Sequence, residues 1–485
     1  MSLLVYNSMT RQKEEFVPII PGYVGMYVCG PTVYSHSHVG HAKSYVSFDV
    51  VARYLRYLDY KVLYIQNITD VGHLTDDADE GEDKLVRQAR YERVHPMQIA
   101  ETIMRSYFED MDALNIIRPD ISPRASGHIP EQIELIERLI ERGYAYVVDG
   151  SVYYDVQKFP EYGKLSGRSI DEAVEGTRVE LRSEKRHPAD FALWKKAEKG
   201  HIMRWKSPWG EGFPGWHIEC SAMSMKYLGE SFDIHGGGMD NRFPHHECEI
   251  AQSEGATGKQ FVKYWFHNNL VTINGQKMSK SLGNFITLKE LFQKYKPGVV
   301  RFLILQSHYR STLDFSDGAL QAAKSGYEKY MNALSNLHLA IQKASDESGA
   351  QELPFDLQAY EARFCEAMND DFNTPQALAT LFDLTKETNQ ILNLDRSFNK
   401  VALQNIENVF QKLGENVLGI TLESRSTQIG EREVETQLVD LLVTMRSEIR
   451  KQKLWNLSDE IRDKLLELGY ILEDKKEGTT WRRII

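Results

Sequence analysis

The expected fold follows from Tyr23–His41, which reads YVGMYVCGPTVYSHSHVGH. Its first six residues form an apolar run typical of a buried strand, which Gly30 and the proline after it bring to an end. An apolar-periodic stretch over Ser44–Asp59 then predicts a helix, and Lys61–Gln66 predicts a second strand. A strand, a glycine-bearing loop, a helix and a strand make a βαβ unit, and nucleotides bind at the carboxyl ends of such strands.

The bulk properties set the broad class. The 485 residues, 42% of them hydrophobic, suffice for three or four domains with full-sized cores. No stretch approaches the ~20 apolar residues of a membrane span, and the N-terminus lacks a signal-peptide pattern. Four scattered cysteines form no disulfide framework, so we expect a reducing, cytoplasmic compartment. The net charge of −11 argues against indiscriminate nucleic-acid binding, although a local basic surface stays possible.

The pattern along the chain predicts a Rossmann-type parallel α/β sheet in two halves, residues 1–118 and 201–314. An insertion at 119–200 separates the halves, and its part after Tyr154 reads as polar and irregular. We expect a helical bundle at 315–423 and a small C-terminal domain at 424–485. That last domain is predicted to begin with a polar linker, Ser424–Ile429, and to contain a short helix capped by Ser458. The acidic stretch Asp76–Asp83 reads as a solvated loop.

Four side chains from distant segments form a candidate metal site. Cys29 ends the first strand, Cys220 follows a stretch rich in glycine and tryptophan, and His245 and Glu249 are four residues apart. On a helix that spacing places the last two on one face, where they can share an ion. Two thiolates, an imidazole and a carboxylate suit Zn²⁺. A purely structural zinc, or a buried Cys220 without metal, is the alternative.

Two further motifs suit phosphate binding. His38-Val39-Gly40-His41 opens the predicted helix, so main-chain N–H groups and two imidazoles can donate to phosphate oxygens, while Gly40 lets an adenine approach the backbone. Lys277 and Lys280 follow the hairpin signal Asn274-Gly275 and could clamp a triphosphate. When each motif is considered alone, the alternative for the first is a capped helix with two surface histidines, and the alternative for the second is a solvated charged loop.

Together the two motifs resemble, in their order and strand–loop context, the HIGH and KMSKS signatures of class I aminoacyl-tRNA synthetases. The second matches at all five positions, 277–281. The stretches around Cys220 and His245 narrow the resemblance to the cysteinyl-tRNA synthetase family. So do YVCGPTVY at 27–34, NITD at 67–70, NDDFNTP at 369–375 and GTTW at 478–481, which extend the likeness through nearly the whole chain.

This resemblance implies an ATP-dependent, AMP-forming ligase that joins L-cysteine to tRNA(Cys), acts as a monomer, and binds one Zn²⁺ as well as Mg²⁺ with ATP. The 424–485 domain would bind the anticodon. By the same resemblance, the catalytic residues are His38, His41, Lys277 and Lys280; ATP also meets Gly40, Gly236, Gly237 and Asp240; the cysteine pocket comprises Cys29, Gly30, Thr32, Thr69, Trp216 and His235; and zinc is held by Cys29, Cys220, His245 and Glu249. His246 receives no role.

The need to distinguish cysteine from serine and alanine explains why a metal would bind the substrate. Contacts in an ordinary pocket seldom discriminate more than ~10²-fold between two amino acids that differ in one small group. A soft thiolate, however, binds Zn²⁺ far better than a hydroxyl does. This predicts no editing domain, and the 119–200 insertion is too short for one. Cys248 stands where the family is expected to have asparagine or another non-thiol. It is either an alternative ligand or a small hydrophobic spectator, and we expect the spectator.

The C-terminal region offers groups for RNA. Arg446, Arg450, Lys451 and Lys453 crowd one helix, and Trp455 and Trp481 could stack on unpaired bases. The alternative is a solvated basic helix with both tryptophans in a small core. Two other functions stay open. A related ligase joins cysteine to an amino-sugar but lacks such a tail, and a catalytically silent, zinc-containing RNA-binding protein would not need the intact signature motifs.

Replacing Lys280 with alanine tests the role assigned to the KMSKS stretch. We expect Lys280→Ala to lower the rate of adenylate formation far more than the affinity for cysteine, because the lysine would neutralise charge that develops during displacement at phosphorus. Cysteine-dependent ATP–pyrophosphate exchange measures the rate, and cysteine titration measures the affinity. A matched loss of cysteine binding would contradict this role.

Overall fold

The computed structural model describes residues 2–71, 84–170, 172, 184–278, 284–344, 353–394, 398–421, 425–475 and 478–483. The chain divides into two compact units, Met1–Ile420 and Thr421–Ile485, and each is described by itself. The stretch Asp76–Asp83 and Lys280 lie outside the described residues. Among the helices of the described part, none is both long and apolar enough to cross a membrane.

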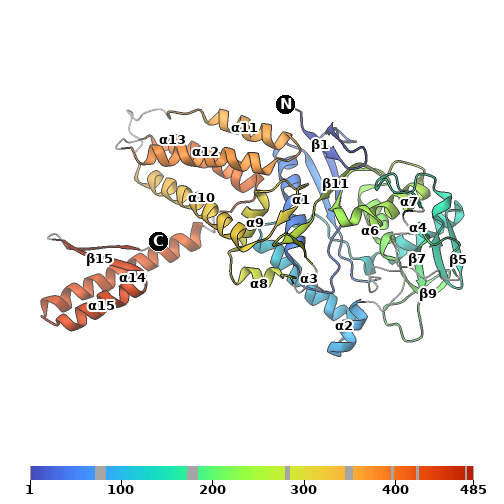
Figure 1. The fold of residues 1–485 in the computed structure, drawn as a ribbon, viewed down its shortest axis with the longest axis horizontal. Helices are drawn as coiled ribbons and strands as arrows, with labels where there is room; N and C mark the ends of the chain where they lie inside the picture. Colours follow the sequence, from blue (N-terminus) through green and yellow to red (C-terminus); the bar gives the residue numbers. More distant parts are fainter. Residues whose placement is uncertain are drawn as a thin grey trace. The chain divides into compact units, whose positions relative to one another are not determined.

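A parallel four-stranded sheet in the first unit confirms the predicted α/β fold (Figure 1). Helix α1 joins β3 to β4, which completes the predicted βαβ unit. The carboxyl-terminal halves of β3 and β4 are buried, as expected where helices cover a parallel sheet. In spatial order the strands are β11 (Val262–Asn268), β10 (Phe232–Gly238), β3 (Tyr23–Val28) and β4 (Lys61–Gln66), and α1 spans Val39–Tyr57.

An antiparallel five-stranded sheet lies between the two halves of this fold in the sequence. The prediction of irregular structure up to residue 200 is wrong at β7, a buried strand whose short apolar core is hidden in the sequence by the polar residues around it. The sheet also continues beyond residue 200, to Pro214. In spatial order it comprises β5 (Ala145–Val148), β6 (Ser151–Tyr154), β7 (Phe191–Lys196), β9 (Gly210–Pro214) and β8 (Trp205–Ser207).

A small three-stranded sheet carries the start of the KMSKS stretch. Strand β12 (Val271–Ile273) pairs antiparallel with β13 (Gln276–Lys277) and parallel with β14 (Leu313–Asp314). Asn274 and Gly275 join β12 to β13 with φ angles of 51° and 76°, the positive values that a two-residue hairpin turn requires. The predicted hairpin is therefore confirmed.

Apart from short 3-10 helices, the remaining elements described in the first unit are mainly α-helical, and the region beyond residue 314 is rich in helices as predicted (Figure 1). They are β1 (Leu4–Asn7), β2 (Gln12–Glu15), α2 (Lys84–Glu92), α3 (Pro96–Ala113), α4 (Ile129–Glu141), α6 (Trp216–Leu228), α7 (His245–Thr257), α8 (Leu288–Phe292), α9 (Pro297–Leu305), α10 (Asp317–Lys343), α11 (Leu357–Asn369), α12 (Thr374–Leu392), α13 (Lys400–Phe410) and the π-helix η5 (Gln411–Val417).

The second unit comprises α14 (Arg425–Lys451), α15 (Trp455–Glu467) and the hairpin of β15 (Tyr470–Lys475) and β16 (Gly478–Arg483). The predicted linker is wrong from Arg425 onward, because these polar residues contain no proline and begin α14. Ser458 is not a cap either, since α15 begins before it.

Two of the side chains that were expected to contact RNA, those of Arg446 and Trp481, instead make contacts inside the second unit. Arg446 is 1% exposed and its Nε donates to the Ser458 carbonyl at 3.3 Å, so it is not part of a basic surface. The Trp481 indole donates to Asp440 at 2.7 Å, and its ring packs on Tyr470 in a small core. Trp455, by contrast, is 54% exposed.

A buried ion pair joins the parallel fold to the helical region. Arg301 in α9 and Asp49 in α1 are 1% and 0% exposed, and the guanidinium of Arg301 donates to the Asp49 carboxylate. Its other N–H groups donate to the carbonyls of Leu114, after α3, and Leu418, after η5, at 3.0 and 2.8 Å. One guanidinium therefore holds four elements together.

We expect Asp49→Asn to lower the free energy of unfolding by about 3–5 kcal/mol, because it leaves the buried guanidinium of Arg301 without its counter-charge. Urea unfolding followed by tryptophan fluorescence measures this. The control is Asp383→Asn, which breaks an exposed ion pair with Arg363 and should cost less than about 1 kcal/mol. Equal losses in the two variants would contradict the role of the buried pair.

Candidate functional site

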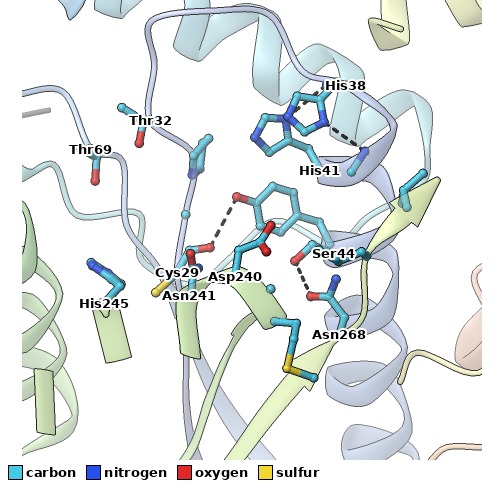
Figure 2. A pocket seen from close by; sticks show the side chains of 18 of the residues that line it. Cys29, Thr32, His38, His41, Ser44, Thr69, Asp240, Asn241, His245 and Asn268 are labelled. Carbon is cyan, nitrogen blue, oxygen red and sulfur yellow. Dashed lines mark hydrogen bonds between the residues drawn. The ribbon is translucent and has the colours of Figure 1, made fainter. Parts of the chain in front are cut away.

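A cavity of about 640 Å³ opens at the carboxyl ends of β3 and β10, beside the N-terminus of α1 (Figure 2). Its wall includes residues from the HVGH stretch, from the candidate metal site and from the KMSKS hairpin. Most residues predicted for the site line it: Cys29, Gly30, Thr32, His38, Gly40, His41, Thr69, Trp216, Cys220, Asp240, His245 and Lys277.

The HVGH residues cap the helix that they begin. Nδ1 of His38 accepts the Gly40 main-chain N–H at 3.0 Å, and Nδ1 of His41 accepts the His38 main-chain N–H at 3.2 Å. Because Nδ1 is the acceptor in both neutral rings, the remaining ring hydrogen sits on Nε2, which is then a donor. A Cβ on Gly40 would lie 2.8 Å from the His38 ring, so the glycine makes room for this arrangement.

The segments around both signature motifs are bonded to each other. The main-chain N–H of Leu288 donates to the Ser37 carbonyl at 2.9 Å, and Thr287 forms a bridge with His38. The Phe285 ring meets His38 edge-on at 5.1 Å. Lys277 lines the cavity from the end of β13, whereas the position of Lys280 is not described.

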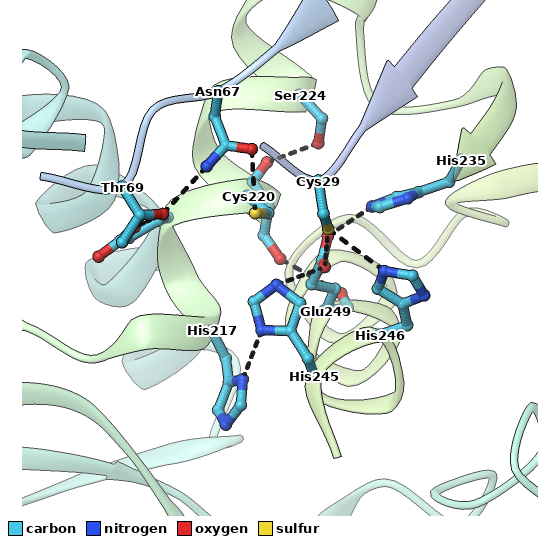
Figure 3. Close-up of polar contacts among 12 residues, drawn as sticks. Cys29, Asn67, Thr69, His217, Cys220, Ser224, His235, His245, His246 and Glu249 are labelled. Carbon is cyan, nitrogen blue, oxygen red and sulfur yellow. Dashed lines mark hydrogen bonds and ion pairs between the residues drawn. The ribbon is translucent and has the colours of Figure 1, made fainter. Parts of the chain in front are cut away.

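The four predicted metal ligands come together from β3, α6 and α7 (Figure 3). One ligand atom from each of Cys29, Cys220, His245 and Glu249 lies within 4.8 Å of all the others, and all four residues are buried. His245 Nε2 is 3.1 Å from Glu249 Oε1, as their four-residue spacing on a helix predicts. Two thiols, one imidazole and one carboxylate at this separation fit a tetrahedral zinc site.

A second donor set overlaps the first and shares Cys29 and Glu249 with it. Nε2 of His235 is 2.8 Å from Glu249 Oε2, and Nε2 of His246 is 3.2 Å from Cys29 Sγ. Neither histidine lines the cavity, whereas Cys29, Cys220 and His245 do. A metal that must meet a substrate needs an open side, so the cavity favours the first set. With a metal in the first set, His235 would orient the Glu249 carboxylate and His246 would orient the Cys29 sulfur, both from the side away from the cavity.

Burial keeps Cys29 and His246 neutral in the absence of a cation. It raises the pKa of the Cys29 thiol well above its usual value and lowers the pKa of His246 well below its usual value. His267, 2.9 Å from His246, has its pKa lowered to about 3 by burial. A dication beside Cys29 would reverse the first shift and favour the thiolate.

Trp216 and two threonines shape the pocket beside the ligands. The Trp216 ring stacks on His245 with ring centres 4.4 Å apart. Thr69 Oγ1 donates to Glu219 Oε2 at 2.9 Å, and Thr69 is bridged to Thr32. A Cβ on Gly30 would lie 1.6 Å from the Asn67 carbonyl oxygen, so only glycine fits there.

Three residues predicted to contact substrates lie behind the cavity wall. His235 is fully buried against Glu249. A Cβ on Gly236 would lie 2.4 Å from the Phe48 ring, and one on Gly237 would lie 2.7 Å from the His246 ring. These glycines therefore let α1 and α7 pack closely on β10. Asp240, in the turn after β10, does line the cavity.

Other lining residues were not predicted. Ser44 Oγ donates to Asn268 Oδ1 at 2.9 Å (Figure 2), and Asn241 also lines the cavity. The position of Ser44, one turn after His41 on the same helix, was the available signal; the asparagines carried none. Cys248 belongs to neither donor set, and its Sγ lies 3.4 Å from the Tyr162 hydroxyl in the core.

Comparison with known proteins defines the class. The family model of the tRNA synthetases class I (C) catalytic domain matches residues 15–325, and a DALR domain model matches residues 363–423. The fold is shared with a Mycobacterium tuberculosis methionyl-tRNA synthetase bound by methionyl-adenylate (TM-score 0.59, 16% identity, 82% of this chain and 92% of that one). It is also shared with an Agrobacterium radiobacter LeuRS in a ternary complex with tRNA (TM-score 0.59, 12% identity, 83% and 85%). The catalytic domain is that of a class I tRNA synthetase.

Within this class, curated relatives narrow the family. The chain is 55% identical to the cysteine–tRNA ligase of Chlorobaculum tepidum over 491 residues, covering 99% of both chains. Those of a Thermus thermophilus strain and of Bacteroides fragilis are 52% and 49% identical, again over 99% of both chains. The chain belongs to the cysteine–tRNA ligase family.

Metal content distinguishes the two donor sets. We expect Cys220→Ala to lose bound zinc, because it removes a ligand that only the first set contains, and His246→Asn to retain it. Elemental analysis of the purified variants after dialysis against zinc-free buffer measures this. Zinc retained by Cys220→Ala and lost from His246→Asn would assign the ion to the second set instead.

Proposed function

We propose that the chain activates L-cysteine with ATP to cysteinyl-adenylate and transfers the cysteinyl group to the 3′ end of tRNA(Cys). One observation carries the proposal. A single cavity has the thiol-rich donor set at one end and the HVGH residues with Lys277 at the other. An amino acid held at the first end has its carboxylate directed toward an ATP held at the second. The names of the full-length relatives support the same activity.

In the activation step, a carboxylate oxygen of cysteine attacks the α-phosphorus of ATP in line and pyrophosphate leaves. The ribose hydroxyl of tRNA then attacks the adenylate carbonyl and AMP leaves. No protein nucleophile is needed, so the enzyme works by positioning and electrostatic stabilisation. Nε2–H of His38 and His41 would donate to phosphate oxygens, while Lys277, Lys280 and Mg²⁺ would balance the charge on the departing pyrophosphate.

Cysteine selection would depend on a bound zinc held by Cys29, Cys220, His245 and Glu249. When bound, the ion supplies an electrophile that accepts a thiolate and discriminates against a hydroxyl or a methyl group. The chain's own part is steric and orienting. Trp216 and His245 wall the pocket on one side, Thr32 and Thr69 on another, and His235 fixes the Glu249 carboxylate at 2.8 Å.

The second unit and the DALR-matched region would hold the tRNA. Lys451 at the end of α14, Lys453 in the connection and Trp455 at the start of α15 are all exposed, which gives positive charge next to a stacking surface. This patch replaces the wider one predicted from the sequence, which included the buried Arg446. We further propose a monomer that acts in the cytoplasm, on the strength of the family.

Cysteine-dependent ATP–pyrophosphate exchange tests the activation step, with serine as the control substrate. We expect exchange with cysteine but not with serine, lost when zinc is removed and restored by added zinc. Exchange that survives complete zinc removal would leave a ligase but overturn the account of its selectivity. Absence of exchange under every condition would overturn the proposed function in favour of a silent RNA-binding protein.

A further inference from the structure

Lys43 is a buried cation near the site that the mechanism above does not use. It lies on α1, two residues after His41, and is 1% exposed. Its ammonium donates to two main-chain carbonyls, those of Leu270 at 3.1 Å and of Ser311. Burial lowers the pKa of Lys43 to about 8, so at pH 7 the amine is still mostly protonated. Lys43 does not line the cavity, so it cannot touch a substrate there.

The two carbonyls belong to the root of the KMSKS hairpin. Leu270 immediately precedes β12, and its carbonyl also accepts the Leu313 main-chain N–H at 3.1 Å. Ser311 lies two residues before β14. The ammonium therefore joins the strands on the side where the three-stranded sheet begins. One edge strand of that sheet, β13, ends with Lys277, whose partner across the ladder is Thr272.

The start of α8, which follows the KMSKS stretch in the chain, is also bonded to the start of α1. Leu288 and Thr287 contact Ser37 and His38, as described above. The described residues on either side of the signature lysines are thus held by Lys43, before Lys277, and by Ser37 and His38, at Thr287 and Leu288. Both anchors belong to the HVGH region, so the relative position of the two motifs depends on them.

A purely space-filling role does not account for this arrangement. Aliphatic residues are the usual choice for the buried face of a helix, and burying an ammonium is costly unless it is hydrogen-bonded. Its acceptors here come from two chain segments that meet just before the sheet they begin, where Asn269 also donates to the carbonyls of Tyr309 and Arg310 at 2.9 Å each. An uncharged side chain of similar length would fill the space but release the Ser311 carbonyl.

We propose that Lys43 is a positioning residue for the activation step, one that fixes the root of the Lys277 hairpin to the helix bearing His38 and His41. This inference rests on the proposed function. It predicts that loss of the ammonium affects the ATP end of the cavity and spares the cysteine end, because Cys29, Cys220 and His245 are held by other elements.

The test compares Lys43→Met and Lys43→Arg with Tyr54→Phe in ATP–pyrophosphate exchange. Tyr54 is a buried residue of the same helix whose hydroxyl donates to Asn369 at 2.8 Å, away from the cavity, so its variant controls for the loss of a buried hydrogen bond. We expect Lys43→Met to lower kcat/KM for ATP roughly tenfold or more. The KM for cysteine and the zinc content should stay unchanged. Lys43→Arg should recover most of the activity, and Tyr54→Phe should match the wild type.

Unchanged ATP kinetics in Lys43→Met, or equal losses for ATP and cysteine, would overturn the inference. Hydrogen exchange gives a second readout that needs no activity: amides of residues 271–277 and 313–315 should lose protection in Lys43→Met while those of β3 and β4 keep theirs. If Lys43→Met does not fold, hydrogen exchange of the same amides in Lys43→Gln tests the inference instead. A wild-type chain without ATP–pyrophosphate exchange activity would instead refute the proposed function, whatever the effect of Lys43 on the hairpin.

Discussion

Hydrogen bonds from the carboxyl end of β3 to its two parallel neighbours place the whole site. The Cys29 N–H donates to the Gly236 carbonyl at 3.0 Å, and the Gly30 N–H donates to Asn67 Oδ1 at 2.8 Å. These bonds bring the ends of β3, β4 and β10 to one edge, although the strands are far apart in the chain. The approach is so close that Gly30 has no space for a side chain. Every group of the donor set lies on or beside this edge, so its geometry depends on the register of the sheet.

Much of this could be predicted from local pattern. The apolar run before Cys29 and the periodic stretch after Gly40 identified a strand and a helix, and the carboxyl end of a parallel strand is where ligands bind. The spacing of His245 and Glu249 indicated one helix face, and their ligand atoms are indeed adjacent. Asn274-Gly275 identified the hairpin. Each of these features is decided within a few residues of sequence, which is why pattern was enough.

The features that the sequence did not disclose depend on contacts between distant segments. Gly236 and Gly237 resembled a ligand-binding loop, yet their missing side chains make room for Phe48 and His246. Arg446 looked like part of a basic surface because its neighbours are basic, but its hydrogen bond to Ser458 comes from another helix. The start of α14 looked like a linker because polar composition does not distinguish a helix from a loop. In each case the local pattern fits two structures, and for the glycines and Arg446 packing decides between them.

The same packing explains how the donor set can exist before a metal binds. Burial of two thiols, an imidazole and a carboxylate would be costly if they were charged and unpaired. The raised pKa of the Cys29 thiol means that this group is instead neutral, as is His246 behind it, and Glu249 has partners in His235 at 2.8 Å and His245 at 3.1 Å. Zinc binding would therefore exchange the proton of Cys29 for a cation, within elements that the sheet already holds in place. Because the scaffold is fixed by β3, α6 and α7 and needs no ion, one side of the donor set stays open to the cavity.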